Sequence, residues 1–253
     1  KRLLYIICAF IGSIIFITGF SLLVELIDRT LRDAYRSRRL TGLPVIAAFN
    51  GTNNLKYRGF LKACNRRAAA YACQQINGYL QPNRATIINL LSIEEREGKS
   101  FLAKYFAQYW ESEGLHVRIV NHDIDFEKES KSYVQAQQLS DFWQLNDAEQ
   151  QPDIILVEYP ALCHYDVPEK VLAESDFNLL VANAARLWSE KDNARLRSVK
   201  DILKDKSLYL YLNNADRETV ESFTGELPPH NSVHSFFRRL AQLGLTSQKA
   251  AVK

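Results

Sequence analysis

The stretch from residue 92 to residue 100 is the feature that most constrains the fold of this chain. It reads Ser-Ile-Glu-Glu-Arg-Glu-Gly-Lys-Ser, it follows the apolar run 85–91, and a helical pattern continues from it at Phe101. A strand, a loop ending in Gly-Lys-Ser and a helix are the context that a phosphate-binding loop requires. The N-terminus of such a helix directs free backbone N–H groups at an anion. The stretch therefore predicts a P-loop.

Four residues at the end of this loop are predicted to bind a nucleotide: Glu97, Gly98, Lys99 and Ser100. The ammonium group of Lys99 would reach the outer phosphates, and the hydroxyl group of Ser100 would be a ligand of Mg²⁺. The alternative is a chance Gly-Lys-Ser at the start of a helix. The strand pattern before the tripeptide and the helical pattern after it favour the P-loop.

The loop departs from the usual P-loop pattern in its shape and in its charge. Ile93 stands where the first glycine is normally found, and Ile does not reach the backbone angles that Gly allows. Glu94, Glu95 and Glu97 add negative charge where phosphates would bind, and Arg96 offsets it in part. Like charges repel, so the sequence predicts weakened or lost binding of ATP.

The rest of the chain alternates between helical and strand patterns, which is typical of an α/β fold. We expect a P-loop NTPase-like domain with a mostly parallel, doubly wound sheet and helices on both faces. Strand patterns cover 86–91, 117–121, 153–157, 177–182 and 208–212, and helical patterns cover about 55–79, 98–112, 133–143, 184–204 and a last stretch around Phe236 and Phe237. The run 45–49 is either a short strand or an extended linker.

Polar residues follow several of these strands, where an open α/β sheet binds its ligands. Asp123 and Glu158 are candidate catalytic residues and, with Ser100, candidate Mg²⁺ ligands, because Mg²⁺ prefers oxygen. Asn213 is a candidate for recognising the nucleotide base. Each has a structural alternative: a turn or helix cap for Asp123, a buried or capping carboxylate for Glu158, and a strand-end turn for Asn213.

The segment from Leu3 to Val24 has no charged residue and is mostly apolar. At 1.5 Å per residue it would span about 30 Å, the thickness of the hydrocarbon core of a bilayer. The apolar region of a signal peptide would be shorter, and a buried soluble helix would show a polar face. We therefore expect a transmembrane helix over 1–26, a juxtamembrane linker over 27–50 and a P-loop domain over 51–253.

The charges that flank this segment predict its orientation. Lys1 and Arg2 precede it, and a larger basic group follows it at Arg29, Arg32, Arg36, Arg38 and Arg39. The positive-inside rule then places the C-terminal domain in the cytoplasm.

The net charge and the cysteine spacing argue against nucleic-acid binding and against a fold built on disulfides or on a cysteine metal site. A net charge of +3 is too small to indicate a nucleic-acid partner. The four cysteines match neither a disulfide framework nor a metal-site spacing. Cys163 and His164 are adjacent, but no second pair of ligands accompanies them in the sequence.

Several short motifs, in their order along the chain, resemble the second half of bacterial polysaccharide co-polymerases, or chain-length determinants, of the Bacteroidetes exopolysaccharide type. The matching segments are 28–32, 40–45, 97–100, 158–160, 184–188 and 225–228. The resemblance implies a tyrosine-kinase-like domain that binds ATP and Mg²⁺ through Lys99, Ser100, Asp123 and Glu158. It also implies a homo-oligomer in the bacterial inner (plasma) membrane, a polysaccharide polymerase or export machinery as partner, and a further membrane helix and periplasmic domain before Lys1.

Four departures from that family predict a degenerate domain without autokinase activity. Asn121 stands at the family's first acidic position, and Glu158 replaces an Asp. The Glu-x-x-Arg-x-x-Arg helix has no match, and the last tyrosine is Tyr211, so the usual acceptor tail is missing. We expect a regulator of exopolysaccharide or capsule chain length or export. The alternatives are an active ATPase or tyrosine autokinase, and a membrane-tethered partitioning-type ATPase.

Overall fold

The computed structural model describes residues 2–51, 59–144, 150–204 and 206–228, and within the first helix it leaves out the side chains at positions 3, 4, 6, 8, 9 and 25. The predicted last helix around Phe236 and Phe237 lies outside the described residues.

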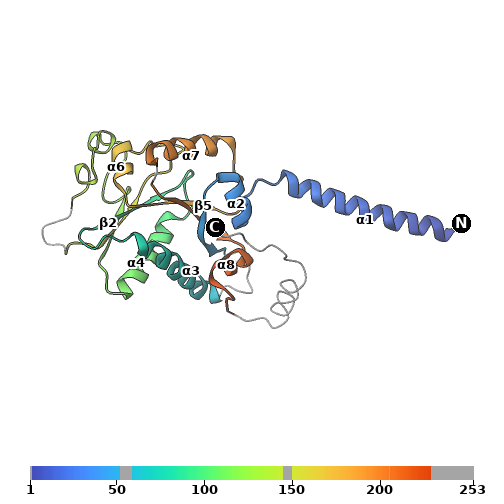
Figure 1. The fold of residues 1–253 in the computed structure, drawn as a ribbon. Helices are drawn as coiled ribbons and strands as arrows, with labels where there is room; N and C mark the ends of the chain where they lie inside the picture. The colour runs from blue at the N-terminus through green and yellow to red at the C-terminus, as the bar shows by residue number, and fades with distance from the viewer. Residues whose placement is uncertain (1, 52–58, 145–149, 205, 229–253) are drawn as a thin grey trace.

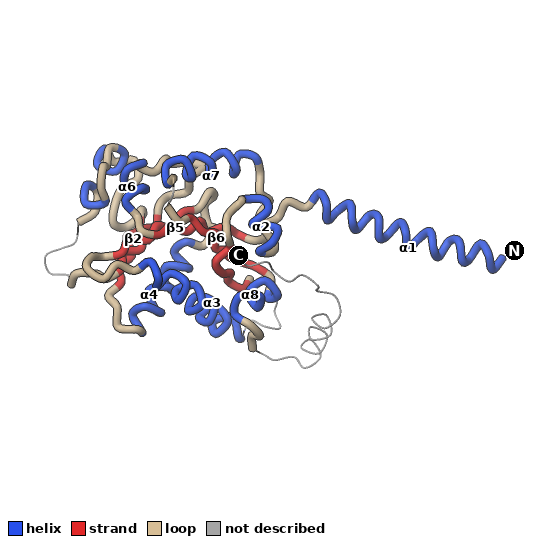
Figure 2. Tube along the Cα trace, viewed as in Figure 1, coloured by secondary structure: helices blue, strands red, loops and turns tan. Residues whose placement is uncertain are grey.

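A six-stranded sheet in which every pairing is parallel forms the centre of the molecule (Figure 2). Its strands, in the order β1-β6-β5-β2-β4-β3, are β1 (Val45–Asn50), β6 (Leu208–Ala215), β5 (Phe177–Asn183), β2 (Thr86–Leu91), β4 (Ile154–Glu158) and β3 (Val117–Asn121). All six residues of β2 are buried. A strand buried on both faces is typical of a parallel sheet, and it places the P-loop in the middle of the domain.

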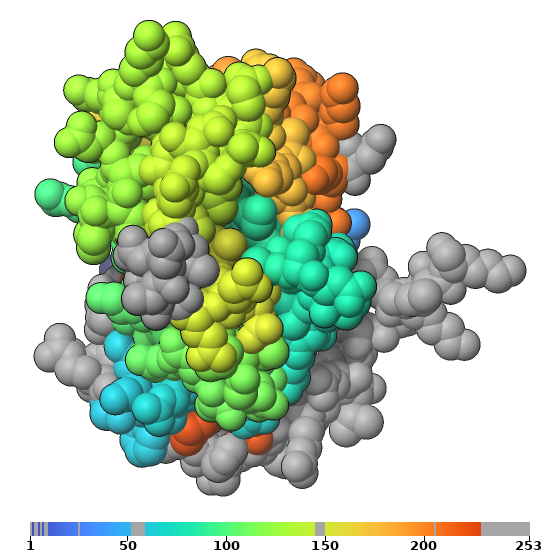
Figure 3. Space-filling model, turned by 90° about the vertical axis from the view of Figure 1, so that its left-hand side faces the viewer, coloured from blue at the N-terminus to red at the C-terminus, as the bar shows by residue number. Residues whose placement is uncertain are grey.

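Helices cover both faces of the sheet. One face carries α2 (Ala34–Thr41), α6 (Glu169–Glu174) and α7 (Glu190–Leu203), and the other carries α3 (Leu61–Ile76), α4 (Lys99–Ser112) and α8 (Arg217–Thr224) (Figure 1). The described residues after β3 that include the short α5 (Lys131–Val134) lie on the same side of the molecule as α7 (Figure 3). The predicted α/β architecture, with a parallel sheet covered on both faces, is therefore confirmed.

The sheet begins before the domain boundary that we predicted at residue 51, because β1 is an edge strand of the sheet. Its residues pair in parallel with β6, and its four central residues are buried. The expected linker over 27–50 is therefore packed into the domain. Sequence reasoning left this segment open because its partner strand lies more than 160 residues further along the chain.

Two predicted helices are shorter than their patterns suggested. The pattern over 133–143 yields only α5 and a 3₁₀-helix at Leu139–Asp141. The carboxylate of Asp141 accepts the backbone N–H groups of Gln137 and Gln138, and this contact ends the helical hydrogen bonding there. Similarly, α7 begins at Glu190 because Ser189 and Asp192 form a capping box.

The first helix, α1 (Arg2–Ile27), projects away from the sheet domain (Figure 1). Among the described residues, no helix reaches the combination of length and apolar character needed to cross a membrane. The expected transmembrane span therefore stays a prediction.

The chain after α1 rejoins the domain through residues 29–31. Thr30 forms an isolated antiparallel bridge with Leu187. The backbone N–H of Leu31 donates to the carbonyl of Arg186 at 3.3 Å, and that of Trp188 donates to the carbonyl of Arg29 at 2.9 Å. These bonds fasten the base of α1 to the segment that follows β5.

Candidate nucleotide site

The predicted P-loop joins β2 to α4, and the N-terminus of α4 is open. Gly98 is the N-cap residue, and no described side chain caps the helix there. The first backbone N–H groups of a helix lack partners within it, so this end attracts an anion. A cavity of about 480 Å³ opens at this point. It is lined by Glu95, Arg96, Glu97, Gly98, Lys99, Ser100, Phe101, His122, Asp123, Lys128, Pro160, Ala161 and Tyr165.

The loop needs a glycine at position 98. The φ angle of Gly98 is 102°, and a Cβ atom there would lie 2.1 Å from the amide nitrogen of Asn213. The other positive φ angle in the loop belongs to Arg96, at 57°. Ile93 is buried in the core, so the missing glycine at position 93 falls where the loop does not use a positive φ.

Glu97 lines the cavity, but its side chain is buried and ion-paired, so the unbalanced charge that we expected to oppose a phosphate is not present at this position. Its carboxylate lies 2.7 Å from Nε of Arg186 and accepts the backbone N–H of Glu94 at 3.1 Å. The same guanidinium also pairs with Asp192 at 2.9 Å and lies over the ring of Trp188. Burial raises the pKa of Glu97, and Arg186 opposes that shift. An ion pair thus balances one of the three loop glutamates.

Lys99 lines the cavity, and most of its side chain is buried. Its ammonium group donates a hydrogen bond to Oγ of Ser92 at 2.5 Å, and that hydroxyl donates to the carbonyl of Glu94 at 2.7 Å. Burial lowers the pKa of Lys99, and the charges of Glu97 and Glu158 oppose this shift. A phosphate in the cavity would supply the charge partner that the buried ammonium group requires.

Ser100 and Glu158, two of the predicted Mg²⁺ ligands, are in contact. The hydroxyl of Ser100 donates to Oε2 of Glu158 at 2.6 Å, and the side-chain amide of Asn121 donates to the same oxygen at 3.1 Å. The parallel pairing of β3 with β4 sets Asn121 opposite Glu158, which explains the second contact. Glu158 is buried behind Ser100, and this burial raises its pKa. Ser100 lines the cavity, and its hydroxyl oxygen and the adjoining carboxylate oxygen of Glu158 fit the preference of Mg²⁺ for oxygen ligands.

Asp123 lines the same cavity and has an exposed side chain. Its backbone N–H donates to the side-chain oxygen of Asn121 at 2.8 Å, so it also occupies the turn that was our alternative for it. The adjacent His122 lies 3.4 Å from the Asp123 carboxylate, and burial lowers the pKa of His122. The metal-binding and catalytic roles of Asp123 stay predictions.

Asn213 stabilises the loop through hydrogen bonds. Its amide nitrogen donates to the carbonyl of Glu97 at 3.0 Å, and its side-chain oxygen accepts the N–H of Asn214 at 2.9 Å. It does not line the cavity. The geometry supports a positioning role, and base recognition stays an untested prediction.

Sequence reasoning missed three residues that the site uses. Arg186 belongs to a family motif but received no role, because its partner Glu97 is 89 residues away and no local pattern connects them. Lys128 and Tyr165 line the cavity from irregular segments, and the ammonium of Lys128 lies 4.5 Å from the centre of the Tyr165 ring. No local pattern singled out Lys128, because it lies in the irregular stretch between the end of β3 and the start of α5.

A scan against protein-family models finds no match, and a search of curated proteins finds no relative. Among solved structures, the chain is similar to the kinase domain of the Escherichia coli tyrosine kinase ETK. That similarity has a TM-score of 0.51 and 13% sequence identity and covers 70% of this chain and 92% of that domain.

Two further solved structures are similar over most of their own length. The BceF tyrosine kinase domain has a TM-score of 0.46 and 15% identity, with 73% of this chain and 98% of that chain covered. The chimerical protein CapA2B2 has a TM-score of 0.46 and 14% identity, with 73% and 100% covered. At 13% identity, this similarity shows only that the chain shares the α/β fold of the ETK kinase domain.

Proposed function

We propose that this chain is the membrane-anchored cytoplasmic module of a polysaccharide co-polymerase, with a P-loop domain that binds nucleotide and Mg²⁺ in a regulatory role. The observation that carries the nucleotide proposal is the uncapped N-terminus of α4 at a cavity lined by Lys99 and Ser100. Lys99 would bind the outer phosphates, and Ser100, with Glu158 behind it, would hold the metal. The Mg²⁺ ion would neutralise phosphate charge when bound.

The polysaccharide role rests on the order of family-like motifs along the chain and on the similarity of the domain to a bacterial tyrosine kinase domain. In this proposal the domain regulates the chain length or export of an exopolysaccharide or capsule. It acts as a homo-oligomer with the polymerase or export machinery as its partner.

We further propose that the domain is not an autokinase. The amide of Asn121 donates a hydrogen bond to Glu158, so the position that would need a carboxylate base holds a donor instead. Residues 212–253 contain no tyrosine. Nucleotide binding would then set the conformation of the loop, and no phosphoryl group would be transferred to the chain itself.

The first test is a calorimetric titration of ATP and Mg²⁺ into the full chain in detergent. We expect saturable binding that weakens about tenfold to a hundredfold in Lys99→Ala, because a hydrogen bond to a charged group contributes about 1.5–3 kcal/mol. The exposed Lys191 lies on α7, so Lys191→Ala serves as the matched control and should bind as the unmodified chain does.

Incubation with ATP followed by detection of phosphotyrosine separates the alternatives. No phosphotyrosine is expected on the chain. A signal that disappears in Lys99→Ala would instead establish the autokinase, and ATP hydrolysis with the same dependence would establish an active ATPase. If a folded chain bound no nucleotide at millimolar concentration, the regulatory nucleotide proposal would be wrong.

Membrane attachment is proposed from the surface of α1. Large apolar side chains are exposed along most of this helix, among them Phe10, Ile15, Phe16, Phe20 and Leu22. Soluble monomers rarely leave so continuous an apolar surface in water. We expect the chain to float with lipid vesicles in a density gradient, where aggregated protein sinks.

The double substitution Ile15→Arg with Phe16→Arg should abolish this flotation, because each charge at a bilayer centre costs about 2.5–3.5 kcal/mol. Tyr35 is also exposed but lies in α2, so Tyr35→Arg should float normally. A chain that stays in the soluble fraction in the presence of lipid would contradict the anchor.

A further inference from the structure

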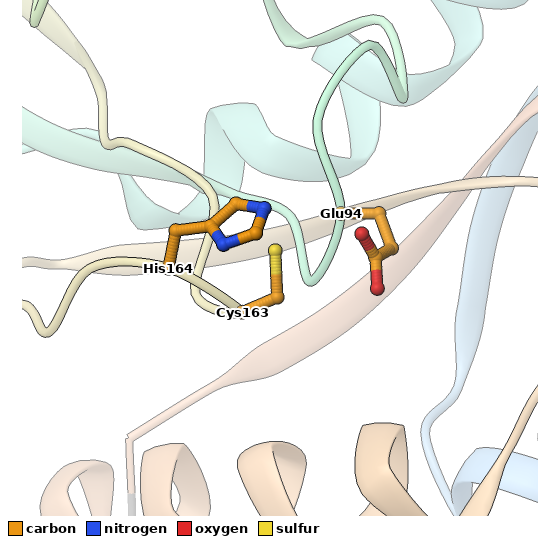
Figure 4. Close-up of side chains that lie close together, drawn as sticks. All are labelled: Glu94, Cys163 and His164. Carbon is orange, nitrogen blue, oxygen red and sulfur yellow. The ribbon is translucent and has the colours of Figure 1, made fainter.

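Three side chains of types that commonly bind metal ions lie close together at the P-loop. None of the three is among the residues predicted to bind the nucleotide. Glu94 belongs to the loop, and Cys163 and His164 belong to the segment that follows β4. One ligand atom from each residue lies within 4.8 Å of the other two. Figure 4 shows the sulfur of Cys163 between the imidazole of His164 and the carboxylate of Glu94.

Backbone hydrogen bonds hold the two segments in this arrangement. The N–H of Cys163 donates to the carbonyl of Ile93 at 2.9 Å, and the N–H of Leu162 donates to the carbonyl of Ser92 at 3.0 Å. The N–H of Glu94 donates to the buried carboxylate of Glu97. The N–H of His164 donates to the carbonyl of Ala161 at 3.1 Å, so the backbone of each of the three residues is held by a hydrogen bond and only side-chain rotation is needed to close the site.

The donor set identifies the class of ion. Sulfur, imidazole nitrogen and carboxylate oxygen together are ligands of Zn²⁺, at about 2.0–2.3 Å, and three protein ligands leave a fourth position for water. Mg²⁺ prefers oxygen ligands alone, so this cluster and the Ser100–Glu158 pair suit different ions. Among the described residues, this is the one group of three or more His, Cys, Asp or Glu side chains with such spacing.

We propose that Glu94, Cys163 and His164 form a binding site for a zinc-class divalent ion that links the P-loop to the segment after β4. Side-chain movements of about 1 Å would bring the three ligand atoms from their present spacing to tetrahedral coordination. The ion would also neutralise Glu94, which is one of the acidic residues of the loop. The site does not depend on the proposed nucleotide function.

The sequence pointed away from this site, because Cys163-His164 has no second pair of ligands nearby. The third ligand, Glu94, is about 70 residues earlier in the chain and is brought close because β2 and β4 are adjacent strands in the sheet.

Cobalt titration of the full chain, purified with a chelator that is then removed, tests the proposal. Co²⁺ is the probe because a cysteine thiolate bound to it gives a charge-transfer band in the near ultraviolet, and tetrahedral coordination gives visible bands. We expect one equivalent of Co²⁺ to produce both, and Zn²⁺ to displace it. Cys163→Ser should remove the charge-transfer band.

His164→Asn and Glu94→Gln should weaken binding at least about tenfold, since even indirect supporting groups contribute that much at metal sites. Cys64 is a buried cysteine of α3 outside the cluster, so Cys64→Ser is the matched control and should keep the band. Circular dichroism checks that each variant is folded.

Two outcomes would overturn the proposal. One is a charge-transfer band of unchanged strength in a folded Cys163→Ser variant. The other is the absence of saturable Co²⁺ binding, and of Zn²⁺ binding measured with a competing indicator, in the unmodified chain. Because neither readout involves ATP, failure of this site is distinguishable from failure of the nucleotide site.

Discussion

Replacing Arg186 with alanine should lower the free energy of unfolding by about 3–5 kcal/mol, the usual cost of removing one partner from a buried ion pair. The guanidinium pairs with Glu97 and with Asp192, whose side chains are only 2% and 3% exposed. Without it, both carboxylates stay buried without a cation. Urea-induced unfolding, followed by tryptophan fluorescence, measures the loss.

Arg195→Ala is the matched control for this change. Its guanidinium also pairs with a carboxylate, but its side chain is 46% exposed and that of its partner Asp166 is 92% exposed. Exposed pairs contribute about 0–1 kcal/mol, so this variant should unfold almost as the unmodified chain does. Equal losses in the two variants would show that the Arg186 contacts contribute little to stability.

The Arg186→Ala variant should also regain stability as the pH falls. Burial holds the pKa of Glu97 above its ordinary value even with Arg186 present, and removing the cation raises that pKa further. The folded state then binds a proton more readily than the unfolded state, so stability rises as the pH falls through the folded pKa. Unfolding curves at several pH values between neutral and mildly acidic should show a shrinking deficit. A deficit that grows toward acid would contradict this account.

Gly98→Ala should destabilise the domain and weaken nucleotide binding, and it should do so more than Gly114→Ala does. Both glycines have positive φ angles, 102° and 87°, which cost a residue with a side chain about 1–2 kcal/mol. Only at Gly98 would the new methyl group also meet a neighbour, the side chain of Asn213 at 2.1 Å. At Gly114 nothing lies within 4 Å, so that variant measures the backbone cost alone.

The double variant Gly98→Ala with Asn213→Ala separates the two contributions. Removing the amide of Asn213 removes the contact, so the stability of the double variant should approach that of Gly114→Ala after the cost of Asn213→Ala itself is subtracted. Thermal unfolding gives the stabilities, and the ATP titration gives the affinities. If the two glycine variants lost equal stability, the close approach of Gly98 to Asn213 would not constrain the loop.

Elements defined by local patterns were predicted well from the sequence. The predicted strands 86–91 and 117–121 coincide with β2 and β3, and α4 begins at Lys99. The rule that open α/β sheets bind ligands at the carboxyl ends of their strands pointed to Asp123 and Glu158 as candidates, and it did not predict the contact of Ser100 with Glu158. In each case the information lies within a few neighbouring residues or in the topology of the fold.

The features that the sequence did not reveal depend on pairs of residues far apart in the chain. We expected the charge of Glu97 to face the phosphates, because no nearby sequence pattern identifies Arg186 as its partner. Cys163 and His164 lacked a third ligand until the sheet brought Glu94 to them. The helix predicted over 133–143 is also interrupted by a side chain. The carboxylate of Asp141 accepts a backbone N–H that a continuous helix would use, and the spacing of apolar residues does not indicate such competition.

The attachment of residues 29–31 to residues 186–188 has a mechanical consequence. The backbone carbonyl of Arg186 accepts a hydrogen bond from the N–H of Leu31. The guanidinium group of Arg186 forms an ion pair with Glu97 in the P-loop. Arg186 therefore connects the base of the projecting helix to the loop, beside the other contacts of residues 29–31. A displacement of residues 29–31 would move the backbone of Arg186, and with it the guanidinium group that pairs with Glu97 in the loop.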